Sequence, residues 1–149
     1  MKKSLIIIPL TFAAFLLGFT ACDDEVQSYV RPQFGAMTVN PSPAEPGDSV
    51  ELIVPHTQKG NGIAATTYTW TIQALCEDAE THQAKDTILT VQDNYDGYGK
   101  RDPRLKFRLP PSCSPGTYPV VMRASFSCYI GNVLFDEATV RGRIVVENQ

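Results

Sequence analysis

Alternating apolar and polar positions predict a chain built mainly from β-strands. The alternation is clearest at positions 67–76, where one face is mostly apolar and the other carries threonine, glutamine and leucine. The residues on the apolar face are Tyr68, Trp70, Ile72, Ala74 and Cys76. Among the large apolar side chains we expect Trp70, Tyr118 and Met122 to lie in the core.

Similar runs recur along the chain, separated by segments rich in proline, glycine and polar residues. The expected strands lie at 34–40, 49–54, 67–76, 86–92, 105–109, 117–129 and 133–147. About seven strands with no helices between them predict an all-β fold, an antiparallel β-sandwich. Gly131-Asn132 suits a tight hairpin, and a slip in the alternation near Gly142 predicts a β-bulge.

The N-terminus follows a different pattern, that of an export signal. Lys2 and Lys3 precede an almost unbroken apolar run from Leu5 to Phe19. A transmembrane helix is one alternative, but it needs roughly 20 apolar residues and this run is short and interrupted by Pro9. An ordinary secretion signal is another alternative.

The residues Phe19-Thr20-Ala21-Cys22 resemble the lipobox of bacterial lipoproteins. The resemblance implies cleavage of signal peptide 1–21 and attachment of lipid, including palmitate, to Cys22. The acidic run Asp23-Asp24-Glu25 is similar to that of lipoproteins displayed on the surface of the outer membrane in one Gram-negative group. Alternatively, these acids only assist translocation.

The segment 22–33 is polar and contains Arg31-Pro32, which disfavours regular structure. We expect it to be an acidic tether, with the sandwich occupying 34–149. The formal net charge of the chain is −3, and it becomes more negative when Lys2 and Lys3 leave with the signal. An acidic chain with scattered basic residues argues against nucleic-acid binding.

Three short motifs resemble landmarks of immunoglobulin-like domains of the PKD type. They are Pro46-Gly47-Asp48-Ser49-Val50, Tyr68-Thr69-Trp70 and Pro115-Gly116-Thr117-Tyr118-Pro119-Val120. In that family they form the turn into strand B, the core aromatic of strand C and the turn into strand F. The resemblance covers roughly residues 37–146 and implies an immunoglobulin-like sandwich.

Such a sandwich would bring Cys76 and Cys113 to the same end, and we expect an exported protein to join them in a disulfide. Cys128 would lie about 33 Å away along its strand. A bridge requires Cα atoms within roughly 7 Å, so Cys128 is predicted to be a free thiol in the core. The alternative is that all three thiols remain unbridged and behave as small apolar groups.

Residues that could support catalysis are scarce. His56 and His82 fall in loops that the expected topology places at opposite ends, so we expect each to be a surface residue. The motifs of serine hydrolases, zinc peptidases and phosphate-binding loops are missing from the sequence. We therefore expect no enzyme activity, no cofactor and no metal.

The loop 93–103 is the best binding candidate. Tyr95 and Tyr98 could stack on a sugar or meet a protein partner. Asp93, Asp96 and Asp102 could add oxygen ligands for calcium, although the spacing is not that of a helix-loop-helix calcium site. A solvated connecting loop is the simplest alternative.

Together these patterns predict a non-catalytic, lipid-anchored cell-envelope protein that serves as a binding, adhesion or scaffold module. Its partners would be the membrane, through Cys22, and an envelope protein or glycan. A glycan-binding accessory lipoprotein of an outer-membrane uptake system is the first alternative, and a small hydrolase is the second.

Overall fold

The computed structural model describes residues 28–78, 80–94, 101–128 and 135–148. Within them no helix is long and apolar enough to cross a bilayer. The strands are β1 (Gln33–Phe34), β2 (Thr38–Asn40), β3 (Ser49–Ile53), β4 (His56–Gln58), β5 (Ile63–Glu77), β6 (Ala84–Asn94), β7 (Arg104–Arg108), β8 (Gly116–Cys128) and β9 (Phe135–Val146). The predicted all-β class is confirmed.

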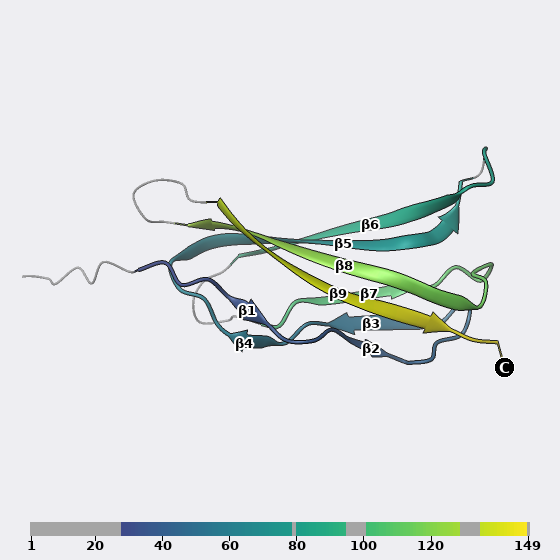
Figure 1. Cartoon of the computed structure of the whole chain (residues 1–149), viewed down its shortest axis with the longest axis horizontal. Helices are drawn as coiled ribbons and strands as arrows, with labels where there is room; N and C mark the ends of the chain where they lie inside the picture. The colour runs from purple at the N-terminus through teal and green to yellow at the C-terminus, as the bar shows by residue number, and fades with distance from the viewer. Residues whose placement is uncertain (1–27, 79, 95–100, 129–134, 149) are drawn as a thin grey trace, which may run out of the picture.

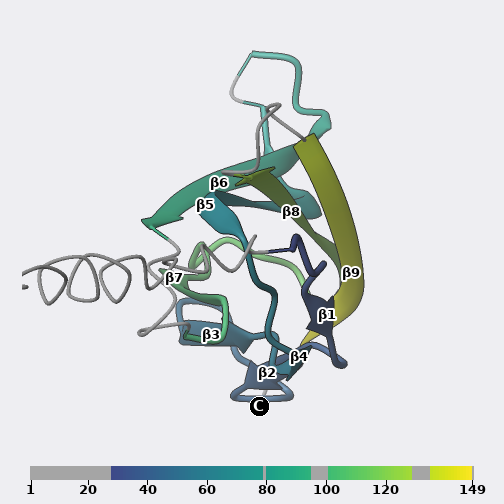
Figure 2. The same ribbon diagram turned by 90° about the vertical axis from the view of Figure 1, so that its left-hand side faces the viewer.

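Two sheets form the layers of an immunoglobulin-like antiparallel sandwich (Figures 1 and 2). One is four-stranded, in the order β6-β5-β8-β9, and the other is three-stranded, in the order β2-β3-β7. Neighbouring strands within each sheet are antiparallel. Strands β1 and β4 form a further small pair at one end of the molecule.

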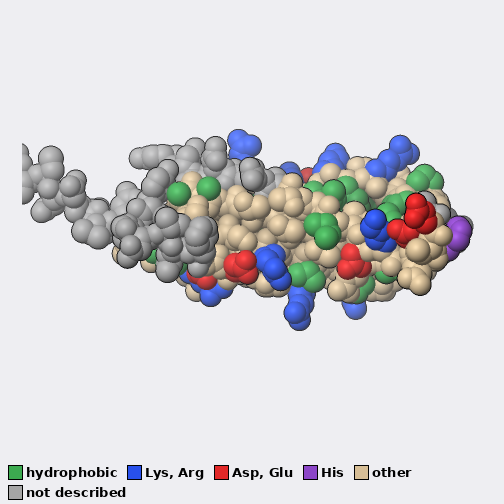
Figure 3. All heavy atoms as spheres, turned by 90° about the horizontal axis from the view of Figure 1, so that it is seen from above, with side chains coloured by type: hydrophobic (Ala, Val, Ile, Leu, Met, Phe, Trp, Pro, Cys, Tyr) green, Lys and Arg blue, Asp and Glu red, His purple; other side chains and the backbone are tan. Residues whose placement is uncertain are grey.

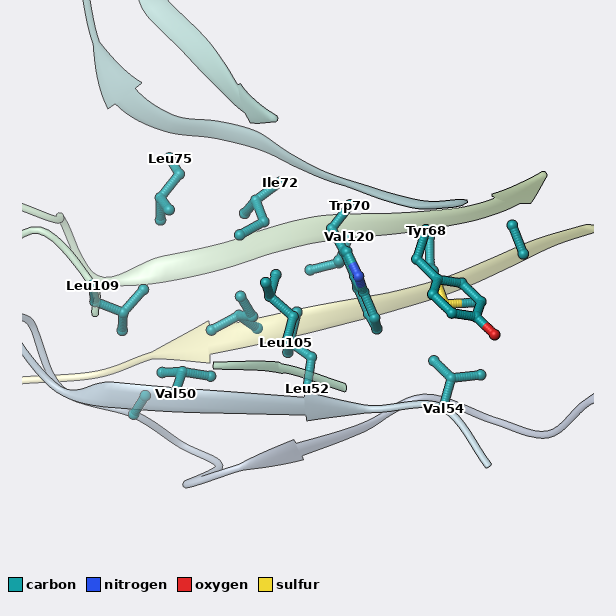
Figure 4. Close-up of a cluster of buried hydrophobic side chains, with 14 of the residues drawn as sticks. Val50, Leu52, Val54, Tyr68, Trp70, Ile72, Leu75, Leu105, Leu109 and Val120 are labelled. Atoms are coloured by element: carbon teal, nitrogen blue, oxygen red, sulfur yellow. The ribbon is translucent and has the colours of Figure 1, made fainter. Parts of the chain in front are cut away.

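Side chains from both sheets fill the space between the layers (Figure 4). Trp70 on β5 and Met122 on β8 are completely buried, as the alternation predicts. Val50 and Leu52 reach them from β3. Tyr118 is half-buried and packs against the edge of this cluster.

Strand β5 departs from the predicted alternation after Ile72. The pairing with β6 shifts between Ile72 and Cys76, and Ala74 adopts a φ of 54°. Ala74 is consequently exposed while Leu75 turns into the core, which reverses the predicted faces. The irregularity bends the β5–β6 hairpin, whose tip rises away from the sandwich in Figure 1.

The bulge predicted at Gly142 is wrong. The register between β8 and β9 runs without interruption from Gly116 opposite Val146 to Ser127 opposite Phe135. Glycine is needed there for space, because a Cβ atom at position 142 would lie 2.6 Å from Met37 Sδ. The apparent slip in the sequence thus reflects a close contact with the residue before β2.

Several strand boundaries also differ from prediction. The expected first strand divides into β1 and β2, and the expected loop 55–65 contains β4 and the start of β5. Strand β6 extends through Asn94 into the expected loop 93–103. The hairpin predicted at Gly131-Asn132 lies outside the described residues.

Candidate functional site

The chain enters the sandwich through a cluster that we call the N-terminal clamp: Tyr29, Arg31, Asp136 and Glu137. The phenol of Tyr29 donates a hydrogen bond of 2.6 Å to Asp136, and Arg31 Nε lies 3.3 Å from the same carboxylate. Arg31 also donates to the carbonyl of Glu137. The backbone N–H of Glu137 donates to Asp136 Oδ1 at 2.8 Å.

The hydrogen bond from Tyr29 is the largest of the effects that lower the pKa of Asp136. The backbone N–H of Glu137 and the charge of Arg31 act in the same direction, and they outweigh partial burial, which opposes them. Asp136 is therefore ionised at neutral pH, and its carboxylate can accept the hydrogen bond from Tyr29 and pair with Arg31.

The residues beside the clamp pack closely on the loop after β4. Val30 and Asn61 exchange backbone hydrogen bonds of 3.1 and 3.0 Å. A Cβ atom at position 60 would lie 2.6 Å from both the Val30 carbonyl oxygen and Pro32 Cγ, so this approach requires Gly60. The part of the predicted tether from Tyr29 to Gln33 consequently belongs to the domain.

The predicted lipidation site Cys22 and the acidic run after it lie outside the described residues. The clamp itself could not be found by alternation, since Tyr29 and Asp136 are 107 positions apart. The signal that was available is the adjacent pair Tyr29-Val30, two large side chains in a segment that is mostly polar.

His56 is not the surface residue that the sequence predicts, because its side chain is only 1% exposed. Its Nδ1 lies 3.1 Å from Asp102 Oδ1, and its backbone N–H donates to the same oxygen at 2.8 Å. The imidazole also contacts the ring of Phe34 at a centroid distance of 4.8 Å. The backbone hydrogen bond is the main cause of the lowered pKa of Asp102.

This arrangement ties the segment before β7 to β4. His82 lies in the β5–β6 hairpin, at the far end of β5 from His56. The two histidines therefore lie at opposite ends of the fold, as the topology predicts. Among the described residues no group of three or more His, Cys, Asp or Glu is placed to hold a metal ion.

The tyrosine-bearing loop is mostly outside the described residues. Asp93 belongs to β6, where its backbone lies opposite Thr66, and Tyr95, Asp96 and Tyr98 are not described. Because β6 ends at Asn94 opposite Ala65, the loop leaves the sheet at the same end as the start of β5.

A hollow of about 680 Å³, which we call the corner hollow, lies between the bent hairpin tip and the corner that joins β7 to β8. Its lining residues are Ala74, Leu75, Cys76, Glu77, Ala84, Pro110, Ser112, Cys113, Ser114 and Tyr118. The hairpin supplies Cys76 and the corner supplies Cys113. The predicted proximity of these two thiols at one end of the sandwich is thus present.

The predicted disulfide is absent from this structure, where both cysteines are free thiols. Cys76 is half-buried, with Sγ 3.4 Å from Thr87 Oγ1, and Cys113 is buried. The backbone of Cys128 lies opposite Ile63, at the end of β8 away from Cys113. Its side chain is not described.

Tyr118 closes the corner hollow on the β8 side. Its hydroxyl donates a hydrogen bond of 2.5 Å to the carbonyl oxygen of Ser114. Interaction with the Cys113 side chain, with a smaller effect of burial, raises the pKa of Tyr118 to about 12. A tyrosine that bonds back to the preceding corner is a known feature of immunoglobulin sandwiches, so the contact supports this fold.

The corner hollow therefore presents two thiols, a protonated phenol and one carboxylate, that of Glu77. Neither histidine lines it. No imidazole among its lining residues is therefore placed to act as a base on either thiol.

No family model matches the chain, and no curated protein matches it either. Among solved structures, the chain is similar to Spo0M, a sporulation control protein from Bacillus subtilis, with 15% sequence identity and a TM-score of 0.39. The likeness covers 79% of this chain and 50% of that protein, so the chain spans half of its length. A likeness of this size shows neither a shared family nor a shared function.

Proposed function

We propose that the protein is a non-catalytic lipoprotein of the outer membrane, anchored through Cys22, whose sandwich serves as a binding, adhesion or scaffold module at the cell surface. The observation that carries the proposal is the N-terminal clamp. It fastens the chain to β9 at Tyr29, only seven residues after the cysteine of the lipobox. A segment of that length spans at most about 25 Å.

A short connection of this kind favours one orientation of the domain. The clamp, β4 and the segment before β7 lie at the end where the chain enters, and this end would face the lipid. The bent hairpin tip and the corner hollow lie at the other end and would face outward. We assign the binding role to that outer end.

The orientation also bears on the glycan-binding alternative. The loop with Tyr95 and Tyr98 leaves β6 at the end that would face the membrane. A polysaccharide outside the cell would reach this loop only if the domain tilted on its tether. Capture of a partner at the outer end is therefore the better supported role.

Export would also place the two thiols of the corner hollow in an oxidising compartment. We retain the Cys76–Cys113 disulfide as part of the proposal, because both side chains line the same hollow. Such a bridge would join the hairpin tip to the β7–β8 corner and stiffen the outer end.

Metabolic labelling with an alkyne analogue of palmitate tests the anchor in a Gram-negative host. The full chain should take up the label and partition with the outer membrane, and Cys22→Ser should abolish both. Cys76→Ser is the matched control, since it also removes one thiol but should keep the label. Equal labelling of the C22S variant would overturn the proposal.

Surface display needs a separate measurement. Protease added to intact cells should digest the wild-type protein, while a periplasmic marker survives. If the protein is cut in lysates but persists on intact cells, the anchor faces the periplasm instead.

A further inference from the structure

The two edges of the four-stranded sheet differ in how they are covered. The β9 edge is occupied at both ends: the N-terminal clamp holds Asp136, and Ala44 exchanges backbone hydrogen bonds of 2.9 Å with Val145 and Glu147. Strand β6 forms the opposite edge and has 11 residues. Among the described residues it pairs with β5 alone.

The composition of β6 is unusual for a free edge. Proteins normally protect such edges with central charges, proline or bulges, because the unpaired backbone groups bind other strands. The six residues from Thr87 to Gln92 are uncharged and lack proline. Among the described residues, Ile88 is the only large hydrophobic side chain that is exposed, with 64% of its surface accessible to solvent.

Much of the described surface of the four-stranded sheet is uncharged. Figure 3 looks onto the four-stranded sheet, where tan and green spheres, which are uncharged, cover much of the face. Thr71 lies beside Ile88 in the register with β5, and Leu89 lies beside Trp70 on the inner face. A strand added at this edge would therefore continue both faces of the sheet.

The sequence of β6 is complementary to itself in one antiparallel register. A two-fold axis through Leu89 pairs Ala84 with Asn94 of a second copy, so that the whole strand is used. The same register sets Lys85 opposite Asp93 at both ends of the pair. Ile88 falls opposite Thr90, which is a favourable pair of β-branched residues.

Neighbouring registers lose this match. A symmetric pairing must join residues of the same face, so the register can move only in steps of two residues. One step sets Lys85 opposite Val91, and the other sets Asp93 opposite Thr87. Each shift also leaves the strand ends unpaired.

We propose that β6 is a self-association edge, through which two copies of this chain join their four-stranded sheets into one continuous antiparallel sheet. The interface is isologous, with backbone hydrogen bonds between the β6 strands and with Lys85 of each copy at the register position opposite Asp93 of the other. Ile88 of each copy then lies beside Thr90 of the partner's strand on the outer face of the joined sheet.

This pairing constrains how an anchored pair can sit. Antiparallel β6 strands place the two N-terminal clamps at opposite ends of the joined sheet. In the orientation proposed above, with the clamp end toward the lipid, the two copies would be anchored in two facing bilayers. Anchoring both copies in one bilayer would instead require the strands to lie along its surface. The proposal itself does not depend on the anchor, because the β6 edge is intact in the sandwich alone.

Sedimentation equilibrium of the full chain in density-matched detergent tests the proposal. We expect a concentration-dependent dimer, and Lys85→Asp and Asp93→Lys should each weaken it by about tenfold by setting like charges opposite each other. The double variant K85D/D93K restores opposite charges and should recover the wild-type dissociation constant. A monomer at all concentrations, or a dimer that none of these changes affects, would overturn it.

The double variant also separates the interface from local damage. Lys85 lies 3.9 Å from Asp78 in the same chain, and D93K cannot replace that exposed ion pair. Recovery in the double variant therefore reports contact between copies. Arg123→Asp is the matched control, because it makes the same charge change on β8, away from the edge, and should leave association unchanged.

Discussion

The phenolic oxygen of Tyr118 lies 2.5 Å from the carbonyl oxygen of Ser114, four residues earlier in the chain. The hydrogen bond closes the corner between β7 and β8 and holds Tyr118 over Cys113. The same side chain thus fixes a turn of the sandwich and one wall of the corner hollow.

Tyr118→Phe removes this hydrogen bond while keeping the ring. We expect a loss of about 1 kcal/mol in the free energy of unfolding at pH 7, measured by urea denaturation. The folded pKa of about 12 lies above the ordinary tyrosine value near 10. The hydroxyl's contribution is therefore complete below pH 10 and is lost as the pH rises toward 12.

The difference between wild type and Y118F should shrink accordingly above pH 10. Equal stabilities at pH 7 would show that the corner does not depend on the hydroxyl.

Gly142→Ala tests the close contact between Gly142 and Met37, which the alternation pattern suggested was a β-bulge. The added Cβ would lie 2.6 Å from Met37 Sδ and 3.0 Å from Met37 Cβ, so the methionine must move. We expect a loss of about 1 to 2 kcal/mol in the free energy of unfolding. In a Met37→Ala background the same substitution should cost little, and a double-mutant cycle by thermal unfolding measures the coupling.

An equal cost of G142A in both backgrounds would exclude the steric explanation. It would point instead to the backbone of β9.

Asp136→Asn weakens the N-terminal clamp by removing the charge that pairs with Arg31. We expect about 1 kcal/mol of local destabilisation, seen as about fivefold faster hydrogen exchange at the Val30 amide. The lowered pKa of Asp136 means that its contribution is present above the ordinary value near 4 and is lost as the pH falls through the folded pKa.

The exchange difference between wild type and D136N should thus be constant from about pH 5 upward and should fade in stronger acid. Asp78→Asn is a matched control: it removes a carboxylate whose pKa is also lowered, but at the hairpin tip, and should leave Val30 unaffected. A response at Val30 to D78N would mean that the effect is not local.

Peptide mapping of the exported protein tests the proposed bridge. We expect Cys76 and Cys113 in one disulfide and Cys128 alkylated without reduction. Closing a loop of this length would contribute about 3 to 4 kcal/mol to stability. Free alkylation of all three thiols would favour the unbridged alternative, and Cys128 in a bridge would contradict the strand topology.

The sequence was informative where burial alternates along one strand. Trp70 and Met122 were assigned correctly to the core because each lies on a strand with a two-residue period. It failed at Ala74, where a bulge changes the phase, and at Gly142, where a distant methionine explains the glycine. Local periodicity contains neither kind of information.

The candidate site was less predictable than the fold. The proximity of Cys76 and Cys113 followed from strand directions alone, whereas the hollow between them depends on the bend of the hairpin. The buried state of His56 depends on Asp102 and Phe34, which are far from it in sequence. Contacts of this kind arise from tertiary packing, so the alternation of apolar and polar positions along the sequence does not reveal them.

The N-terminal clamp finally determines how the domain would respond to mechanical load. A pull from the membrane would reach the sandwich at Asp136, near the start of β9. Since β9 is paired with β8 from Phe135 to Val146, the load would act lengthwise on a whole ladder of hydrogen bonds. Such bonds resist shear together instead of breaking one after another, so the strand that receives the tether is well placed to bear force.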